Sequence, residues 1–328
     1  MISANNTNAA RRPWWLTPAQ RLVALLPAGR FRASEWLGRR VCQPFVGTMH
    51  SERGRLEFEC DLRDSIAREV FFTGRYEPQE TILLQRLLAA GQTFVDVGAN
   101  WGYFSLLAAQ IVGANGKVLS CEPDPRLYTL LQSNLQRNHL HQVHALQLAI
   151  SNQHGSVQLQ GFNEDEGNWG VSRIRVSAEP DHLPQNTFTA QTQLLDDLLD
   201  QVGIETVDLV KLDIEGAEAL ALQGMRTGLR EHRYHSLLVE FHPTLLPEFG
   251  TSAAELADQI CEAGYTALVV DHSPQMNRQA AYSRNMIPSD FVAPASDKFA
   301  WDQWPHLLFV SPQRTELLDS LFNNSYDS

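Results

Sequence analysis

The chain has 328 residues, of which 43% are hydrophobic and 20% are charged, and its formal net charge at pH 7 is −12. This length is sufficient for a large buried core, and the composition is that of a globular protein rather than a fibrous or disordered one. The acidic balance argues against general nucleic-acid binding, because contact with phosphates requires a basic surface.

The charge is unevenly distributed, and the cysteines are isolated. Residues 1–75 carry 12 Lys and Arg against 7 Asp and Glu, so the basic excess lies in the N-terminal part. The four cysteines form no C-x-x-C pair, so neither a disulfide framework nor a zinc site is indicated. The chain contains no apolar run of 18 residues, and residues 1–10 are polar and unlike a secretory signal. We therefore expect a cytoplasmic protein without a transmembrane segment.

A small extension is expected at the N-terminal end. Residues 14–32 form a basic amphipathic segment in which Trp and Leu alternate with Arg. The favoured interpretation is a helical cap with its arginines in solvent, and the alternative is contact with an anionic membrane surface or an acidic partner. Residues 45–49 and 55–62 alternate in hydrophobicity around Ser51-Glu52-Arg53-Gly54, which predicts a β-hairpin.

From Tyr76 onward, apolar runs and helical patterns alternate regularly. This alternation predicts a doubly wound α/β sheet that binds ligands at the carboxyl ends of its strands. Residues 162–190 are polar and lack periodicity, so we expect a long functional loop or substrate-side excursion. Within it Asn168-Trp169-Gly170 is either a substrate lid or an ordinary polar part of the loop. Helices are expected at 80–88, 103–111, 126–138, 194–202, 218–224 and 253–263, and strands at 94–97, 118–121, 143–150, 155–161, 207–212, 236–241, 266–271 and 304–310.

The stretch Thr93–Ser105 combines a buried strand, a glycine turn and a helix start. Gly98 permits a sharp turn, and Gly102 is expected to let the helix approach a ligand closely. The middle glycine that a dinucleotide pyrophosphate requires is missing, while Glu122 follows at the distance of a ribose-binding acid. Ribose without pyrophosphate suits S-adenosylmethionine. The alternative is an ordinary strand-turn-helix with a surface glutamate.

Several motifs together resemble the FkbM family of S-adenosylmethionine-dependent methyltransferases. The resemblance implies a class I methyltransferase fold, a Rossmann-like doubly wound α/β sheet of seven strands with the last strand antiparallel. It also implies methylation of hydroxyl groups on natural products or sugars. We expect an extension at 1–70, an FkbM-like domain at 71–315 and a tail at 316–328. The motifs are G-R-Y-E-P at 74–78, F-V-D-V-G-A-N-W-G-Y-F-S at 94–105, C-E-P-D-P at 121–125, V-D-L-V-K-L-D-I-E-G-A-E at 207–218 and L-V-E-F-H-P at 238–243.

The resemblance also implies roles at the cofactor site. Glu122 would bind the ribose hydroxyls, Ile150 and Ser151 would lie near the adenine, and Tyr76 and Glu77 would close the methionine end. The glycine turn would line the methionine and ribose through Asp96, Gly98, Asn100 and Gly102.

Polar side chains follow two later strands and are the candidates for catalysis. Asp213 and Glu215 follow one strand, and Glu240 and His242 end the next. A carboxylate or an imidazole there is suited to act as general base on an alcohol, and His242 has a suitable ordinary pKa. The alternative is a divalent metal held by Asp213 and Glu240 with His242 or Glu215.

The sequence therefore predicts a small-molecule O-methyltransferase. A nicotinamide-dependent oxidoreductase and a cofactor-binding scaffold without activity are the alternatives, and N- or C-methylation remains open because this fold accepts many substrates. The sequence identifies neither the acceptor nor the oligomeric state.

Overall fold

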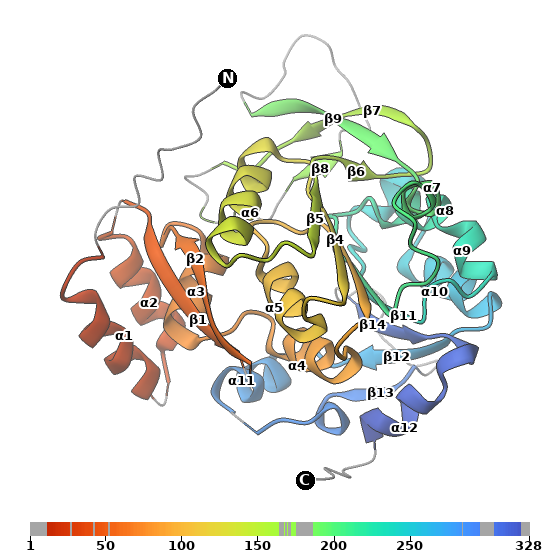
Figure 1. Cartoon of the computed structure of the whole chain (residues 1–328). Coiled ribbons are helices and arrows are strands. Elements are labelled where there is room, and N and C mark those ends of the chain that lie inside the picture. Colours follow the sequence, from red (N-terminus) through yellow and green to blue (C-terminus); the bar gives the residue numbers. More distant parts are fainter. Residues whose placement is uncertain are drawn as a thin grey trace.

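The computed structural model describes residues 12–322 except 27, 42, 52, 164–166, 168, 170–171, 175–185, 284 and 296–304. Its main feature is an eight-stranded sheet in the order β13-β12-β14-β11-β10-β3-β4-β5 (Figure 1). The strands are β3 (Thr93–Val97), β4 (Lys117–Cys121), β5 (Val143–Leu146), β10 (Leu209–Leu212), β11 (Ser236–Glu240), β12 (Thr266–Val270), β13 (Val292–Pro294) and β14 (His306–Val310).

The strand directions confirm the predicted fold class. The pairs from β5 through β11 are parallel, whereas β14 runs antiparallel to both β11 and β12. This is the predicted seven-stranded doubly wound sheet with an antiparallel last strand. The short edge strand β13, which was not predicted, adds an eighth strand antiparallel to β12.

Helices cover both faces of the main sheet because successive side chains of each strand point to opposite sides. Phe94 packs into an apolar cluster with α4 (Pro78–Leu87) and α5 (Tyr103–Val112). Val95 and Val97 pack into a second cluster with helices from the later part of the chain. Those helices are α7 (Leu195–Gln201), α8 (Glu218–Gly224), α9 (Arg226–Arg230) and α10 (Ala253–Glu262).

The N-terminal extension contains the predicted helical segment and hairpin. Helices α1 (Leu16–Leu25) and α2 (Arg30–Gly38) precede strands β1 (Phe45–Ser51) and β2 (Gly54–Cys60), which pair antiparallel. The hairpin packs on α6 (Pro125–Arg137), where Asn134 Oδ1 accepts a hydrogen bond from the backbone N–H of Glu59. Helix α3 (Ser65–Thr73), which was not predicted, lies between the hairpin and α4 in the chain.

A second, four-stranded sheet corrects two sequence predictions. It has the order β6-β9-β7-β8 and contains β6 (Ala149–Ile150), β7 (Gly155–Gln160), β8 (Arg173–Ile174) and β9 (Thr187–Gln193). The strand predicted at 143–150 is in fact two strands in different sheets, β5 and β6. The loop predicted at 162–190 includes β8 and the start of β9, and two polar side chains of β9, Thr189 and Gln191, face solvent.

The remaining described elements belong to the carboxyl-terminal part of the chain. They are α11 (Pro274–Tyr282), α12 (Glu316–Phe322) and 3₁₀ turns at Leu246–Phe249, Pro288–Asp290 and Pro312–Arg314.

Trp169, in the predicted lid, is buried and stacks on Phe162. Asn168 and Gly170 lie outside the described residues. No described helix is long and apolar enough to cross a membrane.

Candidate active site

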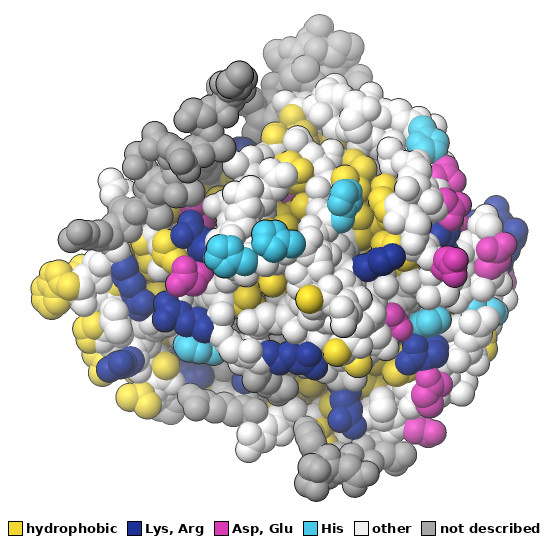
Figure 2. All heavy atoms as spheres, in the orientation of Figure 1, with side chains coloured by type: hydrophobic (Ala, Val, Ile, Leu, Met, Phe, Trp, Pro, Cys, Tyr) yellow, Lys and Arg dark blue, Asp and Glu magenta, His cyan; other side chains and the backbone are white. Residues whose placement is uncertain are grey.

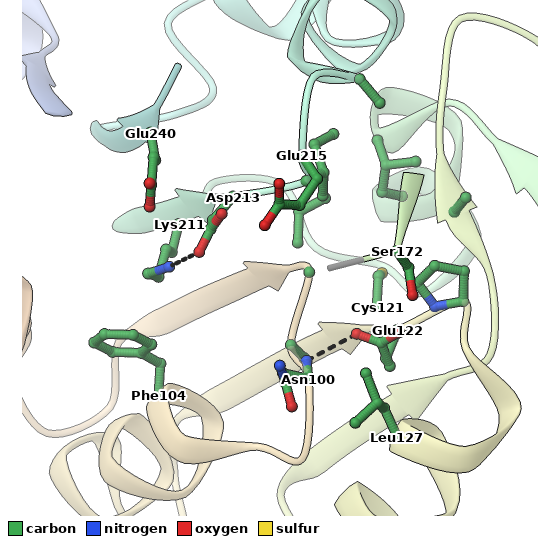
Figure 3. Close-up of a pocket in the computed structure, with 18 of the residues that line it drawn as sticks. Asn100, Phe104, Cys121, Glu122, Leu127, Ser172, Lys211, Asp213, Glu215 and Glu240 are labelled. Atoms are coloured by element: carbon green, nitrogen blue, oxygen red, sulfur yellow. Dashed lines mark hydrogen bonds and ion pairs between the residues drawn. The ribbon is translucent and has the colours of Figure 1, made fainter. Parts of the chain in front are cut away.

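A cavity of about 380 Å³ lies at the carboxyl ends of β3, β4, β10 and β11 (Figure 3). It collects most of the residues singled out in the sequence, although they come from six segments of the chain. Asp96, Gly102 and Ser151 do not line it. The predicted residues that line the cavity are Tyr76, Glu77, Gly98, Asn100, Glu122, Ile150, Asp213, Glu215, Glu240 and His242.

The two glycines of the turn are required for different structural reasons. Both have positive φ, 88° for Gly98 and 98° for Gly102. A Cβ on Gly98 would overlap the carbonyl oxygen of Asp213 on the neighbouring strand. A Cβ on Gly102 would lie 2.6 Å from the Leu131 side chain in α6. Gly102 therefore permits helix packing, and the expectation that it lets the helix approach a ligand is not supported.

Asp96 and Ser151 support the site from outside the cavity. Asp96 accepts a 2.6 Å hydrogen bond from the Ser105 hydroxyl at the start of α5, and Ser105 contacts the Ser120 hydroxyl at 2.7 Å. Burial raises the pKa of Asp96 to about 6. The backbone N–H of Ser151 donates to the carbonyl of Gln193 in the second sheet. These residues tie neighbouring elements together.

Glu122 lies at the end of β4 with both carboxylate oxygens oriented by backbone donors. Oε2 accepts from the N–H of Asn100 and Oε1 accepts from the N–H of Asp124, each at 2.8 Å (Figure 3). Burial raises the pKa of Glu122 to about 8, although these two hydrogen bonds oppose the shift. Each oxygen retains accepting capacity, so the carboxylate is suited to bind a pair of vicinal hydroxyls.

Lys211 is the buried cation of the cavity. Its Nζ lies 2.8 Å from Asp213 Oδ2 and 3.6 Å from Glu77 Oε2. Burial alone would lower the pKa of Lys211, but Asp213, Glu77 and Glu240 outweigh it and hold that pKa well above its ordinary value. The pKa of Asp213 is lowered, because Lys211 and His242 outweigh the effect of its burial. Asp213 is therefore ionised and is a weak base.

His242 is buried and surrounded by acids. Its Nδ1 lies 2.8 Å from Glu218 Oε1, and its Nε2 lies 3.6 Å from Glu215 Oε2 and 3.8 Å from Glu240 Oε1. Burial disfavours the imidazolium, but the Glu218 hydrogen bond and the surrounding carboxylates raise the pKa of His242 to about 9. The suitable pKa that the sequence suggested for a base is therefore not found, because His242 is protonated at neutral pH.

Glu218, at the start of α8, is a structural acid. It is fully buried, and its Oε1 also accepts from the backbone N–H of Gly216.

Glu215 and Glu240 differ in protonation behaviour. Burial raises the pKa of Glu215 to about 7. Burial together with Asp213 and Glu77 raises that of Glu240 well above its ordinary value. Glu215 also has a φ of +50°, which is uncommon for a residue with a side chain. In Figure 3 the Glu215 carboxylate lies between Asp213 and the Glu122 side of the cavity.

A histidine–carboxylate network behind Glu240 was missed in the sequence. Glu80 Oε1 lies 2.6 Å from His272 Nε2 and 3.0 Å from His306 Nδ1. His306 Nε2 is 3.6 Å from Glu240 Oε1. Glu80 precedes His272 by 192 positions and His306 by still more, so no spacing signal could connect it with them. Glu80, His272 and His306 could also be considered as ligands of a metal ion. The distance of 2.6 Å between Glu80 Oε1 and His272 Nε2 is that of a hydrogen bond, because two ligands of one tetrahedral ion lie about 3.3 Å apart.

Among the residues that the structure describes, Asp213, Glu240 and His242 form a second group that offers metal-binding atoms, all within 4.8 Å of one another. The fit to a divalent metal is incomplete. The Lys211 ammonium lies against Asp213 Oδ2 and supplies the positive charge that a metal would bring. The protonated His242 has no free lone pair for a metal.

The strand order, the glycine turn and the buried acid that follows it at the end of β4 define the class. This is a class I S-adenosylmethionine-dependent methyltransferase. Residues 96–267 match the methyltransferase FkbM domain, and the chain belongs to that family. The predictions of family, fold and enzyme class are confirmed, and the oxidoreductase alternative is not favoured.

Relatives with curated names are methyltransferases too. The 2-O-methyltransferase NoeI of Sinorhizobium fredii is 23% identical over 178 residues, which span 50% of this chain and 72% of NoeI. Methyltransferase sdnD of Sordaria araneosa is 30% identical over 161 residues, which span 42% of this chain and 62% of sdnD. A solved SAM-dependent O-methyltransferase from Thermotoga maritima is 14% identical with a TM-score of 0.38, covering 82% of this chain and 78% of that chain.

Proposed function

We propose that this enzyme transfers a methyl group from S-adenosylmethionine to a hydroxyl group of a small molecule. The observation that carries the proposal is Glu215, a cavity-lining carboxylate whose pKa is about 7. An alcohol must lose its proton during methylation, and a carboxylate with this pKa is suited to accept it near neutral pH. The relative NoeI is a 2-O-methyltransferase, which agrees with an oxygen acceptor.

The chain supplies a fitting set of residues for the cofactor. Glu122 would bind the ribose hydroxyls, while Gly98 and Asn100 would approach the cofactor through the turn after β3. Ile150 would lie against the adenine, and Tyr76 and Glu77 would close the methionine end. When bound, S-adenosylmethionine supplies an electrophilic methyl group on a sulfonium. No pyrophosphate-binding turn is needed for this ligand.

The acidic end of the cavity would position and deprotonate the acceptor. Glu215 takes the hydroxyl proton, and the imidazolium of His242, 3.6 Å from Glu215, favours the ionised carboxylate before the transfer. Glu218 fixes the orientation of His242. Lys211 and Asp213, both at the end of β10, form a buried ion pair whose two charges are fixed at neutral pH. Positioning of donor and acceptor in line accounts for much of the remaining rate enhancement.

We further propose that no divalent metal takes part. The ammonium of Lys211 and the imidazolium of His242 already balance the carboxylates where a metal would bind. The metal alternative through Asp213 and Glu240 would require the displacement of Lys211 and the deprotonation of His242. We also expect the acceptor not to be a nucleic acid, because the chain is acidic overall. A cytoplasmic location remains an expectation.

The acceptor is best found by comparing metabolites of a deletion strain with those of its parent. We expect a compound lighter by one methylene in the deletion strain, and fragmentation that places the missing methyl on oxygen. Complementation with wild type or with Glu231→Gln, an exposed acid that does not line the cavity, should restore the methylated compound. Glu215→Gln should not restore it. A missing methyl on nitrogen or carbon, or no difference at all, would contradict the proposal.

A further inference from the structure

The exposed apolar side chains of this protein gather on α1 and α2. Six large hydrophobic residues are exposed among those that the structure describes, and five of them lie between residues 14 and 36. Single exposed apolar residues are normal, but a group of this kind marks an interaction surface. The five, with their exposed fractions, are Trp14 (87%), Leu25 (78%), Leu22 (67%), Trp36 (58%) and Phe31 (45%).

The spacing on α1 gives these residues a common direction. Leu22 and Leu25 are three positions apart, which places them on one side of α1 with Arg21 beside them, and Trp14 lies in the turn just before the helix begins at Leu16. Leu16 and Val23 face inward and are buried in the core. The inward face of α1 therefore packs on the protein, and its outward face is apolar where solvent would favour polar residues.

Arginines surround the apolar residues. Residues 12–40 contain six arginines and one acid, Glu35, whereas the whole chain has a net charge of −12. Arg21, Arg32, Arg39 and Arg40 are exposed. Figure 2 shows hydrophobic and basic side chains side by side over the region where Figure 1 has α1 and α2. We refer to the exposed side chains of residues 14–40 as the α1–α2 face.

We propose that the α1–α2 face binds the surface of an anionic lipid bilayer. The combination of tryptophan, leucine and arginine on a helix surface is typical of helices that lie in the membrane interface. Indole rings are suited to the headgroup level, and arginines are attracted to anionic lipids. Arg40 lies 3.5 Å over the Trp36 ring, so cation and aromatic ring are presented together.

A second copy of this chain is a poorer occupant of the face. In a symmetric dimer the same surface meets itself, so the exposed arginines of the two copies would come together without acids to balance them. Glu35 is the one acid in this segment, and it is already paired with Arg39 at 2.5 Å. The positive charge therefore favours an anionic partner over self-association.

The face also lies close to the active site. Phe31 and Gly29 line a cavity of about 580 Å³ whose other wall includes Tyr76 and Glu77. Tyr76 and Glu77 line the catalytic cavity as well. Binding of α1 and α2 to a membrane would thus bring the acidic end of the catalytic cavity close to the bilayer surface.

The test is co-sedimentation of the full chain with vesicles of phosphatidylcholine alone or with added phosphatidylglycerol. We expect binding to the anionic vesicles that weakens as salt is raised, because exposed charges are screened. Leu22→Ser combined with Leu25→Ser should lower the partition coefficient about tenfold or more, since each leucine loses part of its transfer free energy. Arg21→Gln combined with Arg32→Gln should weaken binding to anionic vesicles and leave binding to phosphatidylcholine unchanged.

Two controls distinguish a specific face from general stickiness. Phe322→Ser removes the sixth exposed apolar residue, which lies in α12, and Arg226→Gln with Arg230→Gln makes the same change in charge elsewhere. Both controls should bind like wild type. All substituted side chains are exposed, so folding should be retained, and circular dichroism checks this. No binding to anionic vesicles, equal losses in the controls, or a dimer that Leu22→Ser and Leu25→Ser dissociate would each overturn the proposal.

Discussion

His242 Nδ1 lies 2.8 Å from Glu218 Oε1, and both side chains are almost completely buried. The two residues come from the loop after β11 and the start of α8, so this contact joins two neighbouring strand-helix units. A buried histidine with a buried carboxylate is held as an ion pair only if both remain charged. The contribution of this contact to the stability of the protein should therefore depend on pH.

Glu218→Gln should lower the pKa of His242 from about 9 toward its ordinary value of 6.5. A histidine whose pKa is raised by folding stabilises the protein below pH 6.5, and this contribution is lost as pH rises through about 9. At about 1.4 kcal/mol per pKa unit, roughly 3 kcal/mol of unfolding free energy is involved. NMR titration of the imidazole and urea unfolding at pH 6 and pH 9.5 measure both quantities.

A surface pair provides the control for this prediction. His154 Nε2 lies 2.7 Å from Asp197 Oδ2, but both side chains are about half exposed. Asp197→Asn should leave the pH dependence of stability as in wild type. If Glu218→Gln behaves in the same way, the buried ion pair is not the source of the effect.

At pH 9, above the Glu122 pKa of about 8, Glu122→Ala should weaken S-adenosylmethionine binding by roughly 1.5–3 kcal/mol, the range for lost hydrogen bonds to a charged group. The physical reason is that Asn100 and Asp124 orient both oxygens of the carboxylate at the cavity wall. Isothermal titration calorimetry measures the change, with the exposed Glu231→Ala as control. An unchanged dissociation constant for Glu122→Ala would refute the ribose assignment.

The sequence was sufficient where a pattern is local. Each strand of the central sheet is a short apolar run, and the turn from Asp96 to Gly102 follows one of them directly, so the fold and the cofactor end of the cavity could be predicted. The sequence was insufficient where the pairing of strands decides which sheet a residue joins. Residues 143–150 are mainly apolar, with only His144 and Gln147 polar, yet the chain divides between β5 and β6 because β6 pairs with β9 in the second sheet.

Distance along the chain explains what was missed at the acidic end. Glu80 and His272 are 192 residues apart and become neighbours only when α4 packs beside the loop after β12. The protonation of His242 could not be predicted either, because it depends on Glu218 being buried and directed inward. The types of side chain at strand ends identify candidates for catalysis. Their pKa values can be predicted only when the neighbouring groups and the burial of each side chain are known.

Gly98→Ala should destabilise the fold by more than about 4 kcal/mol, which is exceptional for one methyl group. The added Cβ would overlap the Asp213 carbonyl oxygen, and the φ of +88° is itself unfavourable for alanine. Gly203→Ala is the matched control, because Gly203 has a φ of +65° with no atom within 4 Å of the added Cβ. It should cost only about 1–2 kcal/mol. Similar values for both variants in urea unfolding would contradict the packing argument.

Removal of metal ions should leave methyl transfer unchanged once the acceptor is known. Lys211 and His242 already provide the positive charge beside Asp213 and Glu240. The measurement is the initial rate after dialysis against a chelator, with and without added Mg²⁺. A rate that falls on chelation and returns with Mg²⁺ would favour the alternative in which Asp213 and Glu240 hold a metal.

Glu215→Gln should lower kcat by about 10²–10⁴, the range for removal of a general base. In wild type the carboxylate must be ionised to accept a proton, so kcat/KM should rise with pH through about 7, the pKa of Glu215. The glutamine variant should lose this dependence while its dissociation constant for S-adenosylmethionine stays the same, because Glu122 and the glycine turn are intact. Glu231→Gln, an exposed substitution of the same kind, should retain wild-type rate and pH profile. If Glu215→Gln keeps the rise through pH 7, a different group accepts the proton, and Glu240→Gln is the next variant to measure because Glu240 lies 3.8 Å from the same imidazole nitrogen.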